Sequence, residues 1–287
     1  MKLITEIKIE KSPVSISHSD KVMLLGSCFS DNIGLKMKAA GFNVMANPFG
    51  PLYNPASIVN AVSRLDSRRP FCEADCVEMG AGAGRICSFE HHSSFARSSA
   101  EEFLSAANDS LEEACDFWQD CTKVVITLGT AWVWRLASRP ELPVVSNCLK
   151  RPAREFLREL LPLEETESLL ASLISAHPGK EFIFTVSPIR HLSDGAHANS
   201  ISKASLLLGI DRAVSCSSHC AYFPAYEIMM DELRDYRFYA EDLVHPRNIS
   251  VNHIWEKFLE FCIPAEDLPA IRSAEKLWRQ SQHRQLL

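Results

Sequence analysis

Short apolar runs that end at a small residue or a proline recur along the chain and predict strands buried on both faces of a sheet. Between them, apolar residues recur every three or four positions, which predicts amphipathic helices. This alternation favours an α/β fold, a three-layer αβα sandwich with a mostly parallel central sheet. The predicted strands cover residues 22–26, 123–129, 182–188 and 221–224; the predicted helices follow Gly26 and Ser99 and cover residues 164–176, 203–214 and about 249–262.

Other segments carry weaker patterns. Apolar and charged residues alternate over residues 3–10, which predicts a short N-terminal strand, and the same segment lacks the apolar run of a signal peptide. The glycine-rich residues 77–92 lack the Lys-Ser/Thr pair of a phosphate-binding loop, so we expect a hairpin or a flexible loop there. We interpret residues 1–264 as one α/β domain with residues 64–99 as an insertion beside the sheet, and residues 265–287 as a polar helical tail.

Composition narrows the class of protein. No stretch approaches the apolar length of a membrane span, and 30 basic against 36 acidic residues without long basic runs predicts no nucleic-acid partner. Ten cysteines in no regular framework fit a reducing cytoplasm. Cys216, His219 and Cys220 are spaced poorly for zinc, so we expect no metal and no cofactor. No pattern fixes an oligomeric state.

Ser27 lies where the buried strand 22–26 ends and an amphipathic helix begins. The carboxyl edge of a parallel sheet opens into the usual ligand crevice, and the first amides of the helix point there. A serine at this position can therefore act as a nucleophile with electrostatic assistance. Serine is also a favoured N-cap, so a purely capping role remains open.

A serine nucleophile needs a base, and His245 with Asp242 three residues before it is the best candidate. A carboxylate at this spacing on a turn can fix the tautomer of the imidazole. Asp194 and His197 repeat the spacing and are a rival pair. We favour Asp242 and His245 because they follow an aromatic segment and directly precede the last predicted helix of the domain.

Several blocks in one order resemble the GSCFA family over about residues 20–262. They are GSCFS (26–30), NPFGPLYNP (47–55), LGTAWVW (128–134), SPIRH (187–191), NSISKASL (199–206) and the stretch at 222–246. That family is similar to the SGNH, or GDSL-like, hydrolases, which are flavodoxin-like αβα folds with a serine near the first strand and Asp-x-x-His near the end. The resemblance implies Ser27 as nucleophile, His245 as base and Asp242 as its partner.

The resemblance also implies a set of oxyanion donors. They are the amide of Ser27, the amide of a glycine matched by Gly50, and an asparagine side chain. Ala131 stands where that asparagine is expected, so the donor has to come from elsewhere. The candidates to replace it are Thr130, Asn47 and Asn54.

For substrate binding, Arg190 and His191 follow a predicted strand and are suited to a polar or anionic group. His92, Asn47 and Asn54 are further candidates.

We expect a serine esterase or deacylase that acts on a small or carbohydrate O-acyl ester through an acyl-enzyme. Two alternatives remain: an acyltransferase with the same triad, and a non-catalytic binding protein that retains the crevice. The thiol of Cys28 is expected to turn toward the helix packing and away from the crevice.

Overall fold

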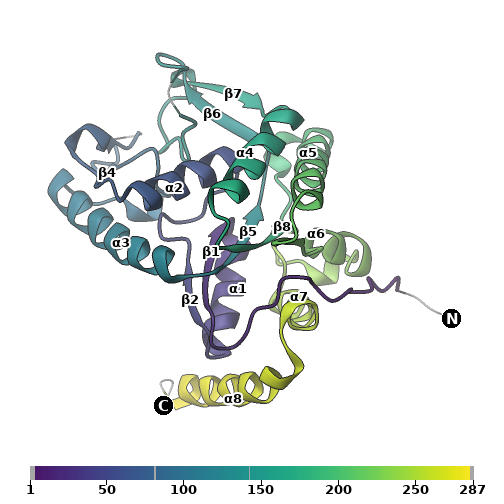
Figure 1. Cartoon of the computed structure of the whole chain (residues 1–287). Coiled ribbons are helices and arrows are strands. Elements are labelled where there is room, and N and C mark those ends of the chain that lie inside the picture. Colours follow the sequence, from purple (N-terminus) through teal and green to yellow (C-terminus); the bar gives the residue numbers. More distant parts are fainter. Residues whose placement is uncertain (1–3, 81, 142, 285–287) are drawn as a thin grey trace.

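The central element is a five-stranded sheet with helices on both faces (Figure 1). The computed structural model describes residues 4–80, 82–141 and 143–284. The strands are β1 (Lys21–Gly26), β2 (Asn43–Ala46), β3 (Val77–Glu78), β4 (Ile86–Cys87), β5 (Lys123–Leu128), β6 (Trp132–Leu136), β7 (Phe156–Leu160), β8 (Glu181–Val186) and β9 (Cys220–Tyr222). The helices are α1 (Cys28–Ala39), α2 (Pro55–Ser67), α3 (Ala100–Asp120), α4 (Leu163–Ala176), α5 (Ala196–Ser215), α6 (Ala225–Glu227), α7 (Asn248–Cys262) and α8 (Leu268–Arg284).

The sheet has the order β2-β1-β5-β8-β9, and every neighbouring pair is parallel. The chain passes from β1 to β2 on one side and then returns to β5 on the other. The strand order therefore reverses between β1 and β5, and in open α/β sheets a ligand crevice forms at the carboxyl end of such a reversal. The predicted three-layer α/β fold is confirmed, and Ser27 directly follows β1 at this point.

Alternating side chains of each strand supply two cores, because successive residues of a strand point to opposite faces. In β1, Met23 and Leu25 pack with α2, α3, α4 and α5, whereas Val22 and Leu24 pack with α1 and α7. All four side chains are fully buried. The sheet is thus covered on both faces, which explains why its strands read as continuous apolar runs.

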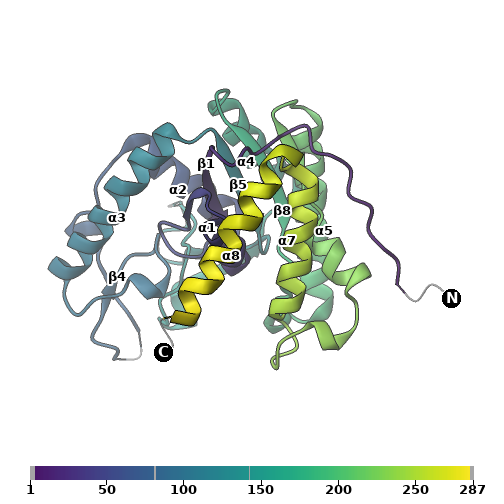
Figure 2. The same cartoon turned by 90° about the horizontal axis from the view of Figure 1, so that it is seen from below.

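The last helix, α8, crosses over α1 beside α7 (Figure 2). Ile271 is fully buried there. The indole nitrogen of Trp255 in α7 donates to Glu275 Oε1 at 2.9 Å. The polar tail expected after residue 264 thus forms a helix that docks on the outer face of the domain.

The N-terminal strand expected at residues 3–10 does not form over residues 4–10, and Leu3 lies outside the described residues. The chain instead runs as an extended coil along α7, where the amides of Ser12 and Ile16 donate to the carbonyls of Phe261 and Cys262 at 2.8 and 2.9 Å. Ile7 and Ile9 are partly buried against the core that includes α7, whereas Ile4 is exposed, so the alternation of the sequence reflects this one-sided contact.

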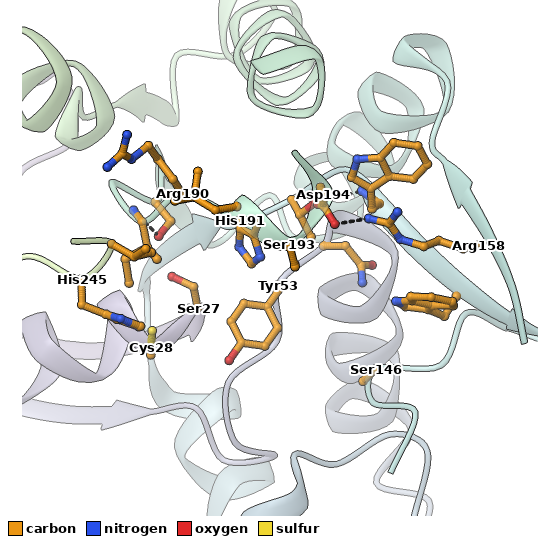
Figure 3. A pocket seen from close by; sticks show the side chains of 18 residues that line it. Ser27, Cys28, Tyr53, Ser146, Arg158, Arg190, His191, Ser193, Asp194 and His245 are labelled. Carbon is orange, nitrogen blue, oxygen red and sulfur yellow. Dashed lines mark hydrogen bonds and ion pairs between the residues drawn. The ribbon is translucent and has the colours of Figure 1, made fainter. Parts of the chain in front are cut away.

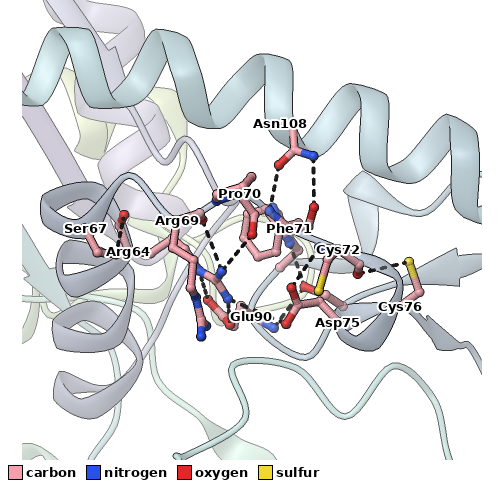
Figure 4. A network of polar contacts seen from close by, with 12 residues as sticks. Arg64, Ser67, Arg69, Pro70, Phe71, Cys72, Asp75, Cys76, Glu90 and Asn108 are labelled. Atoms are coloured by element: carbon pink, nitrogen blue, oxygen red, sulfur yellow. Dashed lines mark hydrogen bonds and ion pairs between the residues drawn. The ribbon is translucent and has the colours of Figure 1, made fainter.

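Residues 64–99 are anchored by a buried polar network (Figure 4). The guanidinium of Arg64, at the end of α2, forms an ion pair with Glu90 and lies 4.2 Å from the centre of the Phe71 ring. From α3, the side chain of Asn108 accepts from the amide of Phe71 at 2.7 Å and donates to its carbonyl at 3.1 Å. Within the segment, β3 and β4 pair antiparallel, as the expected hairpin.

Candidate active site

Ser27 is the N-cap of α1 at the carboxyl end of β1. Its amide donates to the carbonyl of Thr127 in β5 at 3.1 Å, and its Oγ accepts from the amide of Phe29 at 3.3 Å. The preceding Gly26 has φ +140°, and a Cβ there would meet the Thr127 carbonyl oxygen at 2.2 Å. Only glycine allows β1 to turn into the helix this close to β5, so the backbone fixes the position of the serine.

A cavity of about 560 Å³ opens beside Ser27 at the carboxyl edge of the sheet (Figure 3). Its walls come from the start of α1, the segment before α2, the loops after β5 and β8, the β6–β7 hairpin and the loop before α7. The lining residues are Ser27, Cys28, Tyr53, Asn54, Thr130, Trp132, Trp134, Ser146, Arg158, Ser187, Ile189, Arg190, His191, Leu192, Ser193, Asp194, Val244 and His245.

The loop before α7 brings His245 to this cavity already oriented by Asp242. The Nδ1 of His245 lies 2.5 Å from Asp242 Oδ2, and the amides of Val244 and His245 both donate to Asp242 Oδ1 at 2.9 Å. These two amides and then the imidazole lower the pKa of Asp242 to about 2. The carboxylate is therefore ionised at neutral pH and leaves Nε2 of the imidazole available as an acceptor.

The rival pair is not arranged in this way. The carboxylate of Asp194 forms an ion pair with Arg158 at the cavity wall. His197 is exposed and does not line the cavity. Of the two histidines, the structure brings His245 to the cavity that Ser27 lines. The hydrogen bonds of the described residues include none between Ser27 and His245.

The backbone amides expected as oxyanion donors are engaged elsewhere. That of Ser27 bonds to Thr127, as above, and the amide of Gly50 donates to the carbonyl of Asn47 at 2.7 Å. The side chain of Asn47 is also committed, since Nδ2 donates to Asp31 at 2.7 Å and Oδ1 accepts from the last amide of β1 at 2.8 Å. Neither Asn47 nor Gly50 lines the cavity.

Asn54 and Thr130 do line the cavity. The Oδ1 of Asn54 caps α2 by accepting from the amide of Ser57 at 2.8 Å, which leaves Nδ2 as a donor without a partner among the described hydrogen bonds. The hydroxyl of Thr130 accepts from the amide of Trp132 at 3.1 Å and lies 3.0 Å from the hydroxyl of Ser202. If Ser202 donates in that pair, the hydrogen of Thr130 is free to point into the cavity.

The two histidines expected at the substrate site differ in position. His191 lines the cavity with its ring edge-on to Tyr53 at 5.8 Å, and its amide donates to Asn199 at 2.9 Å. Burial lowers the pKa of His191 to about 4, so the ring is neutral at neutral pH. His92 packs outside the cavity, where its Cβ would lie 2.4 Å from a Cβ at Gly50.

Arg190 lines the edge of the cavity, but its guanidinium points away from Ser27 (Figure 3). It donates to the carbonyl of Leu243 at 2.8 Å and lies 5.0 Å from the centre of the Tyr239 ring. Leu243 has φ +59° and lies between Asp242 and His245. Arg190 thus braces the loop that carries the histidine.

The wall opposite this loop is aromatic, and the sequence interpretation missed it. Trp132 and Trp134 project from β6, and the guanidinium of Arg158 in β7 lies 4.2 and 5.4 Å from their ring centres. Asp194 pairs with the same guanidinium. The sequence does contain a pattern that indicates this wall, because two tryptophans that are two residues apart in a strand lie on the same face of it.

The family assignment agrees with this geometry. The profile of the GSCFA family matches residues 21–258, from the start of β1 into α7. The chain belongs to the GSCFA family. The matched segment contains Ser27, Asp242 and His245. No curated protein matches this GSCFA chain.

Three solved structures are similar to this GSCFA protein at low identity. LAE5, an alpha/beta hydrolase enzyme from the metagenome of Lake Arreo in Spain, has 16% identity and a TM-score of 0.40, with 85% of this chain and 95% of that chain covered. A Clostridium thermocellum family 3 carbohydrate esterase has 10% identity and a TM-score of 0.36, with 89% of this chain and 98% of that chain covered. A Corynascus thermopiles (Myceliophthora fergusii) carbohydrate esterase family 2 enzyme with a carbohydrate binding domain has 12% identity and a TM-score of 0.38. The match covers 91% of this chain and 68% of that chain.

Cys28 behaves differently from our expectation in this GSCFA protein. Its side chain packs against the core beneath α1 and also lines the cavity beside Ser27. The first turn of the helix faces the crevice, so the residue after the N-cap cannot avoid it. Burial, followed by the nearby Asp31, raises the pKa of the Cys28 thiol, which keeps the sulfur protonated and weakly nucleophilic at neutral pH.

Three further observations concern the class of protein. Over residues 4–80, 82–141 and 143–284, no helix is both long and apolar enough to cross a membrane. The same residues hold no group of three or more His, Cys, Asp or Glu side chains arranged to bind a metal ion. All ten cysteines are free thiols.

Proposed function

We propose that this GSCFA protein is a serine hydrolase of ester bonds, an esterase or deacylase, with Ser27 as nucleophile, His245 as general base and Asp242 as its orienting partner. One observation carries the proposal. Ser27 at a helix N-terminus and an imidazole held by a carboxylate line the same cavity. Each of these features is common alone, but together they form the arrangement that activates a serine hydroxyl.

In the proposed reaction, Nε2 of His245 takes the Oγ proton as Oγ of Ser27 attacks the ester carbonyl carbon. The tetrahedral intermediate then collapses, the C–O bond of the ester breaks, and Nε2 gives its proton to the departing alcohol. Water next loses a proton to the same nitrogen and attacks the acyl-enzyme. Collapse of the second intermediate releases the acid and returns the proton to Oγ.

The oxyanion donors in this proposal are Nδ2 of Asn54, the hydroxyl of Thr130 and the amide of Cys28. The first two line the cavity with donor capacity left, as described above. The amide of Cys28 is in the first turn of α1, where backbone donors lack intrahelical partners. Asn54 thus supplies from the start of α2 the amide that the loop after β5 lacks at Ala131.

We propose an O-acyl ester of a carbohydrate or other small polyol as substrate. Trp132 and Trp134 offer apolar faces at the cavity wall, and Arg158 with Asp194 supplies polar groups next to them. Flat aromatic faces beside charged hydrogen-bonding groups suit the mixed apolar and polar surface of a sugar ring.

Hydrolysis is favoured over acyl transfer because 51% of the His245 side chain is exposed, so water reaches the base directly. An acyltransferase would have to exclude that water. The free thiols support a reducing, cytoplasmic location. The second candidate function is a non-catalytic binding protein. It is favoured by the Ser27 hydroxyl, which serves as a helix cap for Phe29 and has no hydrogen bond to His245.

Labelling with a fluorophosphonate distinguishes these two candidates without a known substrate. The enzyme is expected to form one adduct, located by peptide mass spectrometry on Ser27, and Ser27→Ala is expected to abolish it. Ser30→Ala is the matched control, because Ser30 lies in the same helical turn but donates to the Leu25 carbonyl and does not line the cavity. An unlabelled, folded wild-type protein would move the assignment to the binding protein.

A further inference from the structure

The face of α5 that meets the cavity wall is polar. Asn199, Ser202 and Lys203 are spaced by three and one residues, so they share one side of the helix, and all three are buried. Asn199 accepts from the amide of His191 at 2.9 Å, and Ser202 accepts from the amide of Ala131 at 2.8 Å. These contacts hold the loop after β8 and the loop after β5, which both line the cavity.

Lys203 ties the two loops together. Its ammonium donates to the carbonyl of Gly129 at 2.7 Å and to the carbonyl of Ser187 at 2.9 Å. Gly129 follows β5 and Ser187 follows β8, so one side chain joins the carboxyl ends of two neighbouring strands. Gly129 itself is pinned from the other side, because its amide donates to the Tyr53 carbonyl at 2.7 Å.

The charge of Lys203 has no carboxylate partner. The side chain is almost fully buried, with 2% of the residue exposed, and the salt bridges of the described residues include none to it. Burying an ammonium without a counter-charge is costly, and replacing it by an apolar residue usually costs less. A reaction that develops negative charge in the adjacent cavity would give a physical reason to keep such a buried cation.

The field of this ammonium reaches the cavity. Burial and then Asp31 raise the pKa of the Cys28 thiol, and the positive charge of Lys203 partly offsets that rise; burial and then Lys203 lower the pKa of the His191 imidazole. Both side chains line the cavity. The other ring facing it is Tyr226, whose centre lies 5.6 Å from Nζ. Lys203 therefore lies behind the wall, close enough to act on the groups around Ser27 but out of contact with a bound molecule.

We propose that Lys203 is a positioning residue for ester hydrolysis: its ammonium fixes the Gly129–Thr130 and Ser187–His191 segments and provides buried positive charge that favours the oxyanion. The inference rests on the proposed function. In this arrangement the cation acts through the Gly129 carbonyl and the field behind Thr130, whereas Asn54 and Thr130 donate directly. A group of this kind stabilises the transition state more than the neutral ester.

The test compares Lys203→Met with Lys257→Met. Lys257 is a second buried lysine, 8% exposed, and donates to the Ile7 carbonyl at 3.1 Å on the side of α7 away from the cavity. For wild type and both variants, we measure the rate of fluorophosphonate labelling and the kcat and KM for hydrolysis of an aryl acetate. Thermal melting of each protein shows whether it is folded. Lys203→Met is expected to lower kcat and labelling about tenfold to a hundredfold with KM changed less than about threefold. Lys257→Met is expected to alter melting only.

The pH profile of the wild type supplies a measurement that needs no variant. Burial lowers the pKa of Lys203 to about 7. The supporting charge is present below that pH and lost above it, so kcat/KM on a neutral ester is expected to fall as pH rises through about 7. The pKa of His191, about 4, and the raised pKa of the Cys28 thiol lie away from this limb. The general base His245 is common to wild type and Lys203→Met and acts in its neutral form, so it contributes only to a rise of kcat/KM with pH. In Lys203→Met the limb should be absent.

The outcomes separate the two proposals. If wild type is labelled at Ser27 but Lys203→Met reacts like wild type, the role of Lys203 is overturned and the hydrolase stands. A wild-type kcat/KM that does not fall between pH 7 and pH 9 likewise overturns the role of the charge, even if Lys203→Met does not fold. If wild type is not labelled and turns over no ester, the hydrolase is overturned and the role of Lys203 falls with it.

Discussion

The serine side and the histidine side of the candidate site are built in opposite ways. Ser27 is 1% exposed and lies between two central strands, with its amide and hydroxyl both hydrogen-bonded. The His245 side chain is 51% exposed and belongs to a surface loop. The sheet fixes the first group, whereas local contacts within a few residues fix the second.

Much of the candidate site is preorganised before substrate binds. The histidine loop has its own frame: the amide of Ala240 donates to the His245 carbonyl at 2.7 Å, and the amide of Arg247 to the Phe238 carbonyl at 2.9 Å. Orientation of the imidazole is therefore complete, but its contact with Ser27 is not. We infer that a small movement of the loop or a rotation of the serine side chain completes the site, as in many ligand-free enzymes.

The largest effect is expected where the histidine side depends on a single group, the carboxylate of Asp242. Asp242→Asn replaces the acceptor at His245 Nδ1 by an amide and favours the wrong tautomer, so kcat on an aryl acetate should fall about a thousandfold or more. Asp235→Asn is the matched control, since this exposed carboxylate caps the turn at Arg237, pairs with the Arg237 guanidinium and does not line the cavity. Equal losses in both variants would contradict a role for Asp242 in orienting the base.

On the serine side, the next largest effect is expected from the proposed oxyanion donors. Asn54→Asp keeps the oxygen that caps α2 at Ser57 but removes the amide donor, and Thr130→Val removes the hydroxyl. Each should lower kcat about tenfold to a thousandfold with little change in KM. Kinetics of both variants and of the double variant check this. A full-rate Asn54→Asp variant would show that the missing amide is not replaced from α2.

A smaller effect is expected when the brace of the histidine loop is removed. Arg190→Gln loses the hydrogen bond to the Leu243 carbonyl, so the loop samples more positions and kcat should fall about tenfold. If Arg190 instead binds the substrate, KM should rise while kcat is retained. Arg237→Gln is the control, because Arg237 is an exposed arginine of the same region that pairs only with Asp235.

The smallest effect is expected at Cys28, next to the proposed nucleophile. Its thiol is protonated at neutral pH and packs beneath α1, so Cys28→Ala should leave the rate of fluorophosphonate labelling within about twofold of wild type. The variant also sharpens the comparison of the two sides, because it alters the serine side without touching a reacting group. A loss of labelling comparable to that of Ser27→Ala would point to the thiol as nucleophile.

The parts of the fold that follow apolar periodicity could be predicted from the sequence. The strands β1, β5 and β8 are buried on both faces, as their continuous apolar runs predict. The helices α1 and α3 begin at serine N-caps, so for them the capping residue and the apolar periodicity indicate the same helix. The helix α5 was predicted only from Lys203, although it begins at Ala196. The first turns of α5 bury the polar side chains of Asn199 and Ser202 against loops. These turns therefore lack the apolar periodicity from which a helix is predicted.

The same reasoning explains what could be predicted of the site. Ser27 and His245 follow from local patterns, a strand that turns into a helix and a carboxylate three residues before a histidine. The aromatic wall and Lys203 do not, because they depend on how β6, β7 and α5 meet in space. Residues 4–10 illustrate the converse error: alternation indicates contact of every second side chain with the core, and a coil that places Ile7 and Ile9 against the core that includes α7 satisfies it without a sheet.

Over the residues that the structure describes, the β6–β7 hairpin pairs with no other strand, since its two strands form a separate sheet. A small apolar group of its own, Val133, Val144 and Leu161 with Ala56 of α2, is separate from the two main cores. We therefore expect that the two strands of this hairpin can be varied while the central sheet keeps its register, with Leu149 of their connection remaining fixed in the core shared with α2 and α3. The piece that carries Trp132 and Trp134 is thus the most replaceable part of the cavity, and diversity of substrates among related proteins is expected to concentrate there.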